Sequence, residues 1–271
     1  FQSHIEQTAF EKMVEEARSL IRQGDMFQCV LSQRFSAEYS GKPLDYYRNL
    51  RVTNPSNYLY FYDFGDYQII GASPESLVSV KQGQVTTNPI AGTRPRGKDE
   101  REDKALAEEL LADEKEVAEH RMLVDLGRND IGKIAQNNSV EVTKYMEVEY
   151  FRYVMHLTSV VRGQLLPQLT AMDALKSTLP AGTVSGAPKI RAMKRIYELE
   201  QEKRGVYAGA IGYLSATGDM DFAIAIRTMI LKNGRAYVQA GAGIVYDSIP
   251  TNEYQETINK AKSMTKIGEM Q

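Results

Sequence analysis

The sequence predicts an α+β fold, and three observations support that class. Strand-like runs rich in β-branched and aromatic residues come in hairpin-like groups. Long amphipathic helical segments separate these groups instead of alternating with single strands. The sequence has no internal repeat and no heptad run, so solenoid and coiled-coil architectures are excluded.

The first helix is expected between a Ser3–Glu6 capping box and Gly24, because apolar residues recur there at helical spacing. The other predicted helices follow the same apolar periodicity. They cover residues 43–52, 99–125, 171–179, 187–203 and 250–267.

The first strand is expected over residues 26–36. Its period of two places Phe27, Cys29, Leu31 and Phe35 on one face and Gln28 on the other. The other predicted strands are apolar or alternating runs bounded by turn residues. They cover residues 58–64, 67–73, 76–80, 84–88, 207–216, 221–232 and 235–246.

The composition is that of an ordinary globular protein, with 42% hydrophobic and 25% charged residues. A net charge of −2 favours neither nucleic acid nor an anionic membrane surface as a partner. No apolar run approaches the roughly 20 residues that span a bilayer. The single cysteine, Cys29, excludes an internal disulfide and suits a cytoplasmic location. We expect residues 1–271 to form one catalytic domain, and the start at Phe1, inside an amphipathic segment, suggests that an upstream segment is missing.

Two predicted helices carry acidic pairs that a hard divalent cation could use. Glu116 and Glu119 lie three residues apart, and Glu253, Glu256 and Lys260 share one face of the last helix. Carboxylate oxygens are the ligands that Mg²⁺ prefers. Taken alone, the first pair is better explained as a solvated acidic face, and Glu256 with Lys260 as a surface ion pair.

Several other features fit a small anionic ligand. The segment "LPAGTVSGAPKIRAM" (179–193) could offer backbone N–H groups, although its spacing does not fit a P-loop. Arg227 lies in an apolar run, where a charge needs either an ion pair or a ligand. His156 is also embedded among apolar residues, as a core histidine or a functional one. Together with Arg94, Arg96 and Lys260, this inventory suits a dianionic acid held by cations and a metal.

The order of the motifs resembles the chorismate-utilising enzymes over nearly the whole chain, and within that family the anthranilate synthases. The motifs are "GASPE", "PIAGTRPRG", "EHRMLVDLGRND", "VMHLTS", "LPAGTVSGAPK", "RGVYAGAIGY", "FAIAIRT" and "GAGIVYDSIPTNEYQETINKA". The resemblance implies an α+β fold of stacked antiparallel sheets flanked by helices.

The resemblance also implies site residues. Glu119 and Glu256 would be Mg²⁺ ligands, with Glu116 and Glu253 nearby, and the metal would hold the ring carboxylate of chorismate. The implied substrate-binding residues are Gln28, Thr93, Tyr207, Arg227, Gly241, Ala242, Gly243 and Lys260.

Three further residues would be catalytic. Glu75 resembles the general acid that protonates the departing 4-hydroxyl. His156 matches the histidine associated with loss of pyruvate, and Thr183 would border the same pocket.

Two positions bear on the nucleophile. Aminodeoxychorismate synthases typically carry a nucleophilic lysine where this chain has Ala91, and isochorismate and salicylate synthases a basic lysine where it has Gln28. With both lysines absent, ammonia is the expected nucleophile.

We therefore expect Mg²⁺-dependent conversion of chorismate and ammonia to anthranilate and pyruvate, through aminodeoxyisochorismate, in tryptophan biosynthesis. A glutamine amidotransferase would supply the ammonia. The alternatives are an aminodeoxychorismate synthase of folate biosynthesis, which Ala91 disfavours, and a chorismate-binding fragment without activity.

Overall fold

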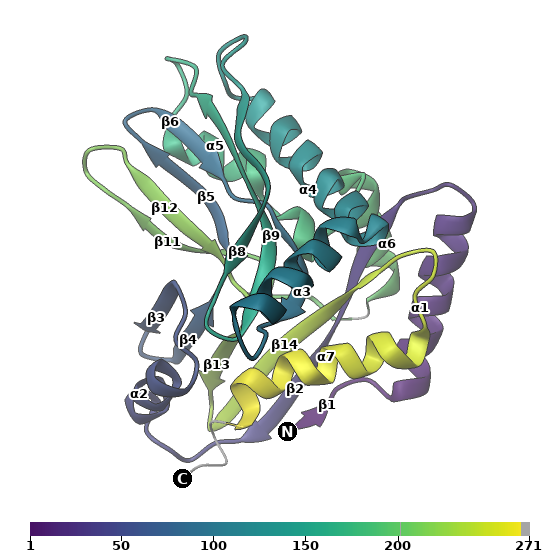
Figure 1. Ribbon diagram of the computed structural model, residues 1–271. Helices are drawn as coiled ribbons and strands as arrows, with labels where there is room; N and C mark the ends of the chain where they lie inside the picture. The colour runs from purple at the N-terminus through teal and green to yellow at the C-terminus, as the bar shows by residue number, and fades with distance from the viewer. Residues whose placement is uncertain (201, 267–271) are drawn as a thin grey trace. The chain divides into compact units, whose positions relative to one another are not determined.

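The computed structural model of the chain describes residues 1–200 and 202–266, which fold into two compact units (Figure 1). The first unit contains Phe1–Glu75, Pro180–Ile211 and the described residues from Ala223 onward. The second contains Ser76–Leu179 and Gly212–Phe222. Both units combine helices with antiparallel strands, so the expected α+β class is confirmed.

The first unit is built on a seven-stranded sheet with the order β1-β2-β14-β13-β4-β3, and β10 pairs with β2. Its longest pairing joins β2 to β14, from Glu38 opposite Arg235 to Cys29 opposite Ile244. The strands are β1 (Gln2–Ser3), β2 (Gln28–Glu38), β3 (Tyr58–Asp63), β4 (Tyr67–Ser73), β10 (Gly186–Ala187), β13 (Thr228–Lys232) and β14 (Arg235–Ile244).

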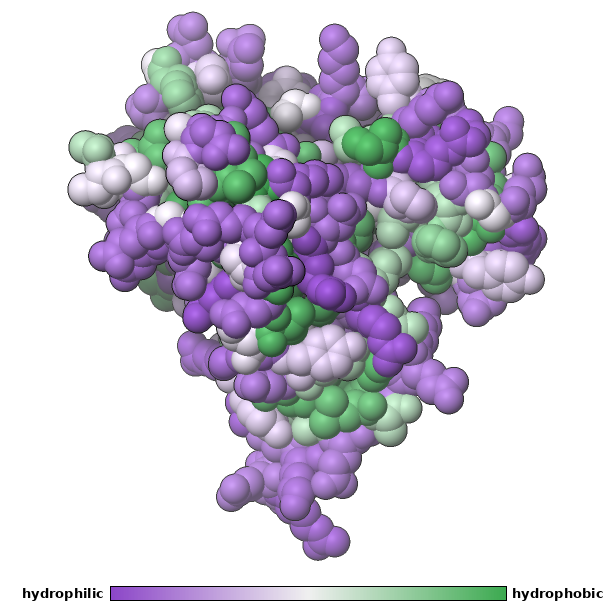
Figure 2. Space-filling view, turned by 90° about the horizontal axis from the view of Figure 1, so that it is seen from above, coloured by the Kyte–Doolittle hydropathy of each residue, from purple (hydrophilic) through white to green (hydrophobic). Residues whose placement is uncertain are grey.

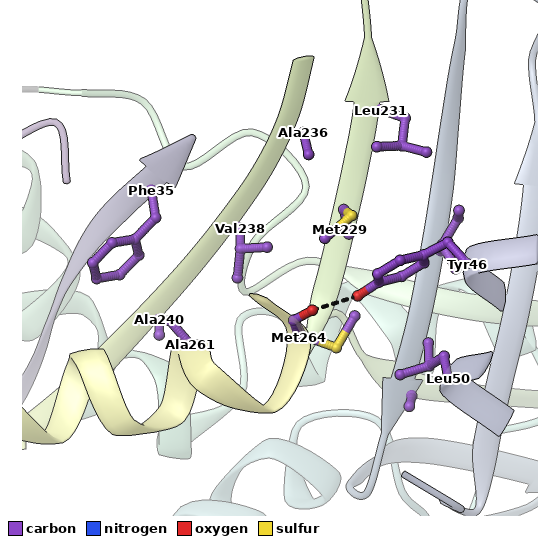
Figure 3. Packing of buried hydrophobic residues seen from close by; sticks show 12 residues of the cluster. Phe35, Tyr46, Leu50, Met229, Leu231, Ala236, Val238, Ala240, Ala261 and Met264 are labelled. Carbon is purple, nitrogen blue, oxygen red and sulfur yellow. Dashed lines mark hydrogen bonds between the residues drawn. The ribbon is translucent and has the colours of Figure 1, made fainter. Parts of the chain in front are cut away.

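Helices of the first unit bury their apolar faces against this sheet. The helical elements are α1 (Gln7–Arg22), α2 (Pro43–Thr53), the 3₁₀ turn η1 (Gly182–Val184), α6 (Lys189–Leu199) and α7 (Pro250–Thr265). Ala261 and Met264 of α7 share a buried cluster with Val238 of β14 (Figure 3). Tyr46 of α2 is fully buried there and donates a 2.8 Å hydrogen bond to the carbonyl of Met264. The last helix is thus fixed to the sheet that carries the candidate site.

The predicted face of the first long strand is confirmed for most of its residues. Cys29, Leu31 and Phe35 are buried in the helix-covered clusters. Phe27 precedes the strand and is 72% exposed, so its expected place on that face is wrong.

The second unit contains a seven-stranded sheet with the order β11-β12-β5-β6-β9-β7, and β8 pairs with β9. The ends of β11 and β12 belong to the first unit. The strands are β5 (Ser76–Lys81), β6 (Gln84–Thr87), β7 (Ile90–Pro95), β8 (Glu141–Tyr150), β9 (Val154–Gln164), β11 (Ala210–Leu214) and β12 (Met220–Ile224).

Three helices belong to the second unit: α3 (Glu100–Ala112), α4 (Glu114–Gly132) and α5 (Ala171–Thr178). The single helix expected over 99–125 is wrong, because Asp113 ends α3 and its carboxylate caps the first turn of α4. The buried cluster of Leu110, Met155 and Leu157 packs α3 against β9.

Other predicted elements also need correction. The capping box at Ser3 is wrong, because Ser3 lies in β1 and α1 begins after Glu6 without a side-chain cap. The strand expected over 221–232 is two strands, β12 and β13, which belong to different sheets. Strands β8 and β9 lie where no element was expected.

The polarity of the surface fits the composition of an ordinary globular protein. On the face seen in Figure 2, hydrophilic side chains predominate and apolar ones form small separate patches. Within the described residues, no helix combines the length and apolar character needed to cross a bilayer.

Candidate active site

In the first unit, Glu75 follows β4 at the point where the chain leaves the sheet. Its backbone carbonyl accepts a hydrogen bond from the amide of Ile224, and its carboxylate accepts one from the Thr183 hydroxyl at 2.8 Å. Burial raises the pKa of Glu75 to about 7, and Thr183, Lys260 and Arg227 each act in the lowering direction. A carboxyl group that is partly protonated near neutral pH can donate a proton, so the expected general acid lies in an environment that suits the role.

Arg227 lies at the break between β12 and β13, not within a continuous strand. Its backbone has a φ of +47°, a left-handed conformation that is unusual for a side-chain-bearing residue. Its carbonyl accepts a hydrogen bond from the amide of Ala72. The structure shows no hydrogen bond from the Arg227 guanidinium to any described residue, and the side chain remains accessible. Desolvation by the surrounding protein lowers the pKa of Arg227, whereas the nearby Glu75 carboxylate acts in the raising direction. The guanidinium is therefore available to an anionic ligand.

Helix α7 contributes Lys260 and Glu256. The Nζ atom of Lys260 lies 2.6 Å from Glu256 Oε1 and donates a 3.1 Å hydrogen bond to the carbonyl of Gly241. A hollow of about 630 Å³ brings these two side chains together with Arg227. It is lined by Arg227, Asn252, Gln255, Glu256, Asn259, Lys260 and Ser263. Each of these residues has a polar side chain and two are cations, which suits an anionic ligand.

Gly241 and Gly243 allow side chains to approach the backbone of β14. A Cβ on Gly241 would lie 2.6 Å from the Tyr207 hydroxyl oxygen and 3.0 Å from the Leu31 carbonyl oxygen. A Cβ on Gly243 would lie 2.7 Å from Nε2 of Gln28, which is 5% exposed. Glycine at these positions therefore leaves room for two of the expected substrate-binding residues.

Ala242 differs from its glycine neighbours. Its side chain is fully buried in the cluster beneath α1 and α6. Only its backbone can contribute to a site on the side of Gly241 and Gly243, so its side chain is not a substrate contact.

In the second unit, His156 and Thr93 are directly opposite each other on β9 and β7. His156 Nδ1 lies 2.9 Å from Thr93 Oγ1 and 3.0 Å from the carbonyl oxygen of Gly92. Because a carbonyl can only accept, this contact favours a proton on Nδ1. In that tautomer Nε2 is unprotonated and can accept a proton. Phe151 lies against the ring, with centroids 5.4 Å apart.

The second unit also holds Glu116 and Glu119, one turn apart on α4. Asp113 accepts hydrogen bonds from the amides of Lys115 and Glu116, both at 3.1 Å, and so fixes the start of the helix. Burial is the main cause that raises the pKa of Glu116, and the charges of Glu119 and Asp113 add to it. Arg94 already lies 3.8 Å from Glu116 Oε1 and acts in the lowering direction, as does Lys115. The carboxylate oxygens themselves are of the type that a divalent metal prefers.

The four expected metal ligands are divided between the units. Glu116 and Glu119 belong to the second unit, and Glu253 and Glu256 to the first. The part of the chain that the structure describes has no group of three or more His, Cys, Asp or Glu side chains able to hold a metal ion. Metal binding therefore stays a prediction.

Two polar groups with polar side-chain partners were not singled out from the sequence. His120, directly after Glu119, is fully buried and its Nε2 lies 2.6 Å from Ser159 Oγ. Arg204 forms an ion pair with Glu200, at 2.6 Å. Both residues lie inside the motifs quoted above. A polar or charged residue type does not by itself indicate whether the side chain pairs within the protein or faces solvent.

Comparison with known proteins shows that residues 1–266 match the family described as chorismate binding enzyme. The anthranilate synthase component 1 of Lactococcus lactis subsp. lactis is 62% identical over 269 residues, covering 99% of this chain and 59% of the relative. That of Aquifex aeolicus is 53% identical over 270 residues, covering 100% of this chain and 55% of the relative. The chain thus spans somewhat more than half the length of these relatives.

Solved structures show the same fold. The anthranilate synthase component I of Streptococcus pneumoniae TIGR4 has a TM-score of 0.92 at 82% identity, covering 97% of this chain and 59% of that one. MenF, the menaquinone-specific isochorismate synthase of Escherichia coli, has a TM-score of 0.89 at 26% identity, covering 98% and 62%. Because synthases with different names share the fold, the choice of nucleophile has to be argued from individual residues.

Proposed function

The chain belongs to the family of chorismate binding enzymes, and from this premise we propose that it is the catalytic portion of an anthranilate synthase acting in tryptophan biosynthesis. The proposed reaction converts chorismate and ammonia to anthranilate, pyruvate and water. Ammonia adds to C2 of the ring as the 4-hydroxyl leaves, giving aminodeoxyisochorismate, and loss of pyruvate then gives the aromatic product.

The observation that carries this proposal is the environment of Glu75. A carboxyl group with a pKa of about 7 faces two cations, Arg227 and Lys260, that could bind the two carboxylates of chorismate. The proton on Glu75 would go to the departing hydroxyl, which leaves as water. The Thr183 hydroxyl holds the carboxyl group in place by the 2.8 Å hydrogen bond.

The remaining groups would bind and orient the substrate. The planar guanidinium of Arg227 suits the carboxylate of the enolpyruvyl group, with Tyr207 beside it. Lys260 and the backbone of Gly241, Ala242 and Gly243 would face the ring carboxylate. A Mg²⁺ ion held by Glu119 and Glu256, with Glu116 and Glu253 nearby, would neutralise and orient that carboxylate.

The second step needs a group that can exchange a proton with the ring. His156 is our candidate, because its contact with the Gly92 carbonyl favours the tautomer with the proton on Nδ1, in which Nε2 is the basic nitrogen. Thr93 accompanies it as the second contact to Nδ1.

Two positions favour ammonia as the nucleophile, because neither side chain can attack the ring itself or activate water to do so. Ala91 on β7 has no amine, and the neutral amide of Gln28 cannot act as a base toward water. We propose that a glutamine amidotransferase supplies the ammonia, and that the protein works in the cytoplasm, where the buried free thiol of Cys29 stays reduced.

Product analysis tests the proposal. The purified chain would be incubated with chorismate, ammonium and Mg²⁺, and the products separated against authentic standards. We expect anthranilate and pyruvate in equal amounts, lost on chelation of the metal. Formation of 4-amino-4-deoxychorismate would instead support the aminodeoxychorismate alternative. Chorismate binding without turnover would support a fragment that only binds.

A further inference from the structure

An ion pair outside the proposed catalytic groups joins three segments of the first unit. Glu200 ends α6, and its side chain is only 7% exposed. Arg204 approaches it with two nitrogens, Nε at 2.8 Å from Oε2 and Nη2 at 2.6 Å from Oε1. This fork-to-fork geometry is stronger and more directional than a single contact between charges.

Both members of the pair also bind backbone. Arg204 donates from Nη1 to the carbonyl of Val184 and from Nη2 to the carbonyl of Val30, each at 2.6 Å. Glu200 Oε1 accepts hydrogen bonds from the amide of Ser32 at 2.8 Å and from its hydroxyl at 2.9 Å. The turn η1 and strand β2 are therefore both hydrogen-bonded to one half-buried guanidinium.

These segments carry groups that the proposed reaction uses. Thr183, which donates a hydrogen bond to Glu75, immediately precedes Val184, whose carbonyl accepts from Arg204. The Arg204 guanidinium carbon also lies 5.4 Å from the centroid of the Tyr207 ring, whose hydroxyl abuts Gly241. A shift of the guanidinium would thus move both the donor to the general acid and a substrate-facing ring.

We propose that Arg204, held by Glu200, is a positioning residue that fixes the Thr183 hydroxyl against Glu75 and the Tyr207 ring against Gly241. The inference rests on the proposed function and deepens it, because it identifies the residue that holds the hydrogen-bond donor of the general acid Glu75 in place. Lysine cannot replace arginine here, since one ammonium group cannot reach a carboxylate and two carbonyls in the fixed plane of a guanidinium.

The test reads the titration of Glu75 directly, without substrate. Protein labelled with ¹³C at the glutamate carboxyl carbons would be titrated by NMR, with the Glu75 signal assigned by its disappearance in Glu75→Gln. Arg227, Lys260 and Tyr207 also face Glu75, and they are unchanged in every variant compared. In Arg204→Lys the Thr183 hydrogen bond, which stabilises the charged carboxylate, should weaken. We expect the midpoint to rise by at least about half a pH unit.

Further variants complete the experiment. Thr183→Val should raise the midpoint similarly, and the double variant Arg204→Lys, Thr183→Val should add little, because both changes remove one interaction. Arg195→Lys makes the same chemical change at another ion pair of α6, with Asp25, and should leave the midpoint unchanged. If Arg204→Lys does not fold, Glu200→Gln weakens the same fork and should shift the midpoint in the same direction.

The outcomes separate this inference from the proposed function. Turnover by Arg204→Lys should show a lower kcat, with the pH dependence of kcat displaced to match the NMR midpoint. An unchanged Glu75 midpoint in Arg204→Lys, or fully additive shifts in the double variant, would overturn the positioning role. Absence of anthranilate from the unaltered protein would count against the proposed function alone, because the NMR readout needs no turnover.

Discussion

The Thr183 hydroxyl donates a 2.8 Å hydrogen bond to the Glu75 carboxylate, although the two residues are 108 positions apart in the chain. The bond joins the end of β4 to the turn η1, so two loops of the first unit meet at one carboxyl group. Burial of that group outweighs the hydrogen bond and the two nearby cations, and the pKa of Glu75 is therefore raised rather than lowered.

The first prediction concerns the pH dependence of turnover. A general acid must carry its proton, and Glu75 loses it as the pH rises through about 7. With the concentration of free ammonia held constant, we expect kcat to fall across this range. Glu75→Gln should lower kcat by about 10²–10⁴ and remove this limb of the pH profile. If kcat of the variant still falls across this pH range, the fall is caused by a group other than Glu75.

The second prediction concerns the metal. Glu256→Gln removes a carboxylate that lies beside Lys260 and is a proposed Mg²⁺ ligand. We expect the Mg²⁺ concentration for half-maximal rate to rise by about tenfold or more. Glu15→Gln, which alters an exposed ion pair with Arg18, is the matched control. Equal Mg²⁺ requirements in the two variants would reject Glu256 as a ligand.

The third prediction concerns the second step. His156→Met keeps the side-chain volume of β9 similar but removes the nitrogen that could accept a proton. We expect chorismate to be consumed while the aminated intermediate accumulates, as seen by chromatography and mass spectrometry. Thr93→Val tests the supporting contact at 2.9 Å and should give a smaller effect of the same kind. A normal anthranilate yield from His156→Met would remove this residue from pyruvate elimination.

The fourth prediction concerns stability. Burial lowers the pKa of His120 from 6.5 to about 4, so the unfolded chain binds this proton more readily than the folded one. The folded state therefore loses stability as the pH falls from about 6.5 to about 4. At about 1.4 kcal/mol per pH unit, the difference between these two pKa values corresponds to a loss of about 3 kcal/mol in the free energy of unfolding.

The measurement compares denaturant unfolding of the unaltered chain and of His120→Asn at several pH values. Asparagine can still hydrogen-bond to Ser159 but does not titrate, so the difference in unfolding free energy between the two proteins should shrink or reverse toward low pH. Glu75, with its raised pKa, contributes stability that is lost as the pH rises through about 7, and this contribution cancels in the difference. A difference that is constant with pH would contradict a neutral buried His120.

Local pattern predicted much of the first unit, because helix periodicity and strand alternation report directly which face is buried. The face of β2 with Cys29 and Leu31 follows from that alternation. The break at Arg227 could not be predicted in this way. An apolar run has the same pattern whether it forms one strand or two strands separated by a residue in the left-handed conformation.

The second unit was harder to predict. Strand β8 has charged residues along most of its length and two register shifts against β9, so neither alternation nor an apolar run marks it. For the site, the resemblance supplied candidates such as Glu75 and Lys260, but Arg204 required geometry. An arginine on the surface and a half-buried arginine that joins several hydrogen bonds look alike in sequence.

The pairing of β2 with β14 has a consequence for synthesis. Residues near 30 can complete their sheet only after residues near 240 have left the ribosome, and such distant pairing is slow to form. Until then β2 is an open strand edge, prone to associate with other nascent chains. Glu75 is made early, but it gains Lys260 as a neighbour only when the last helix is complete.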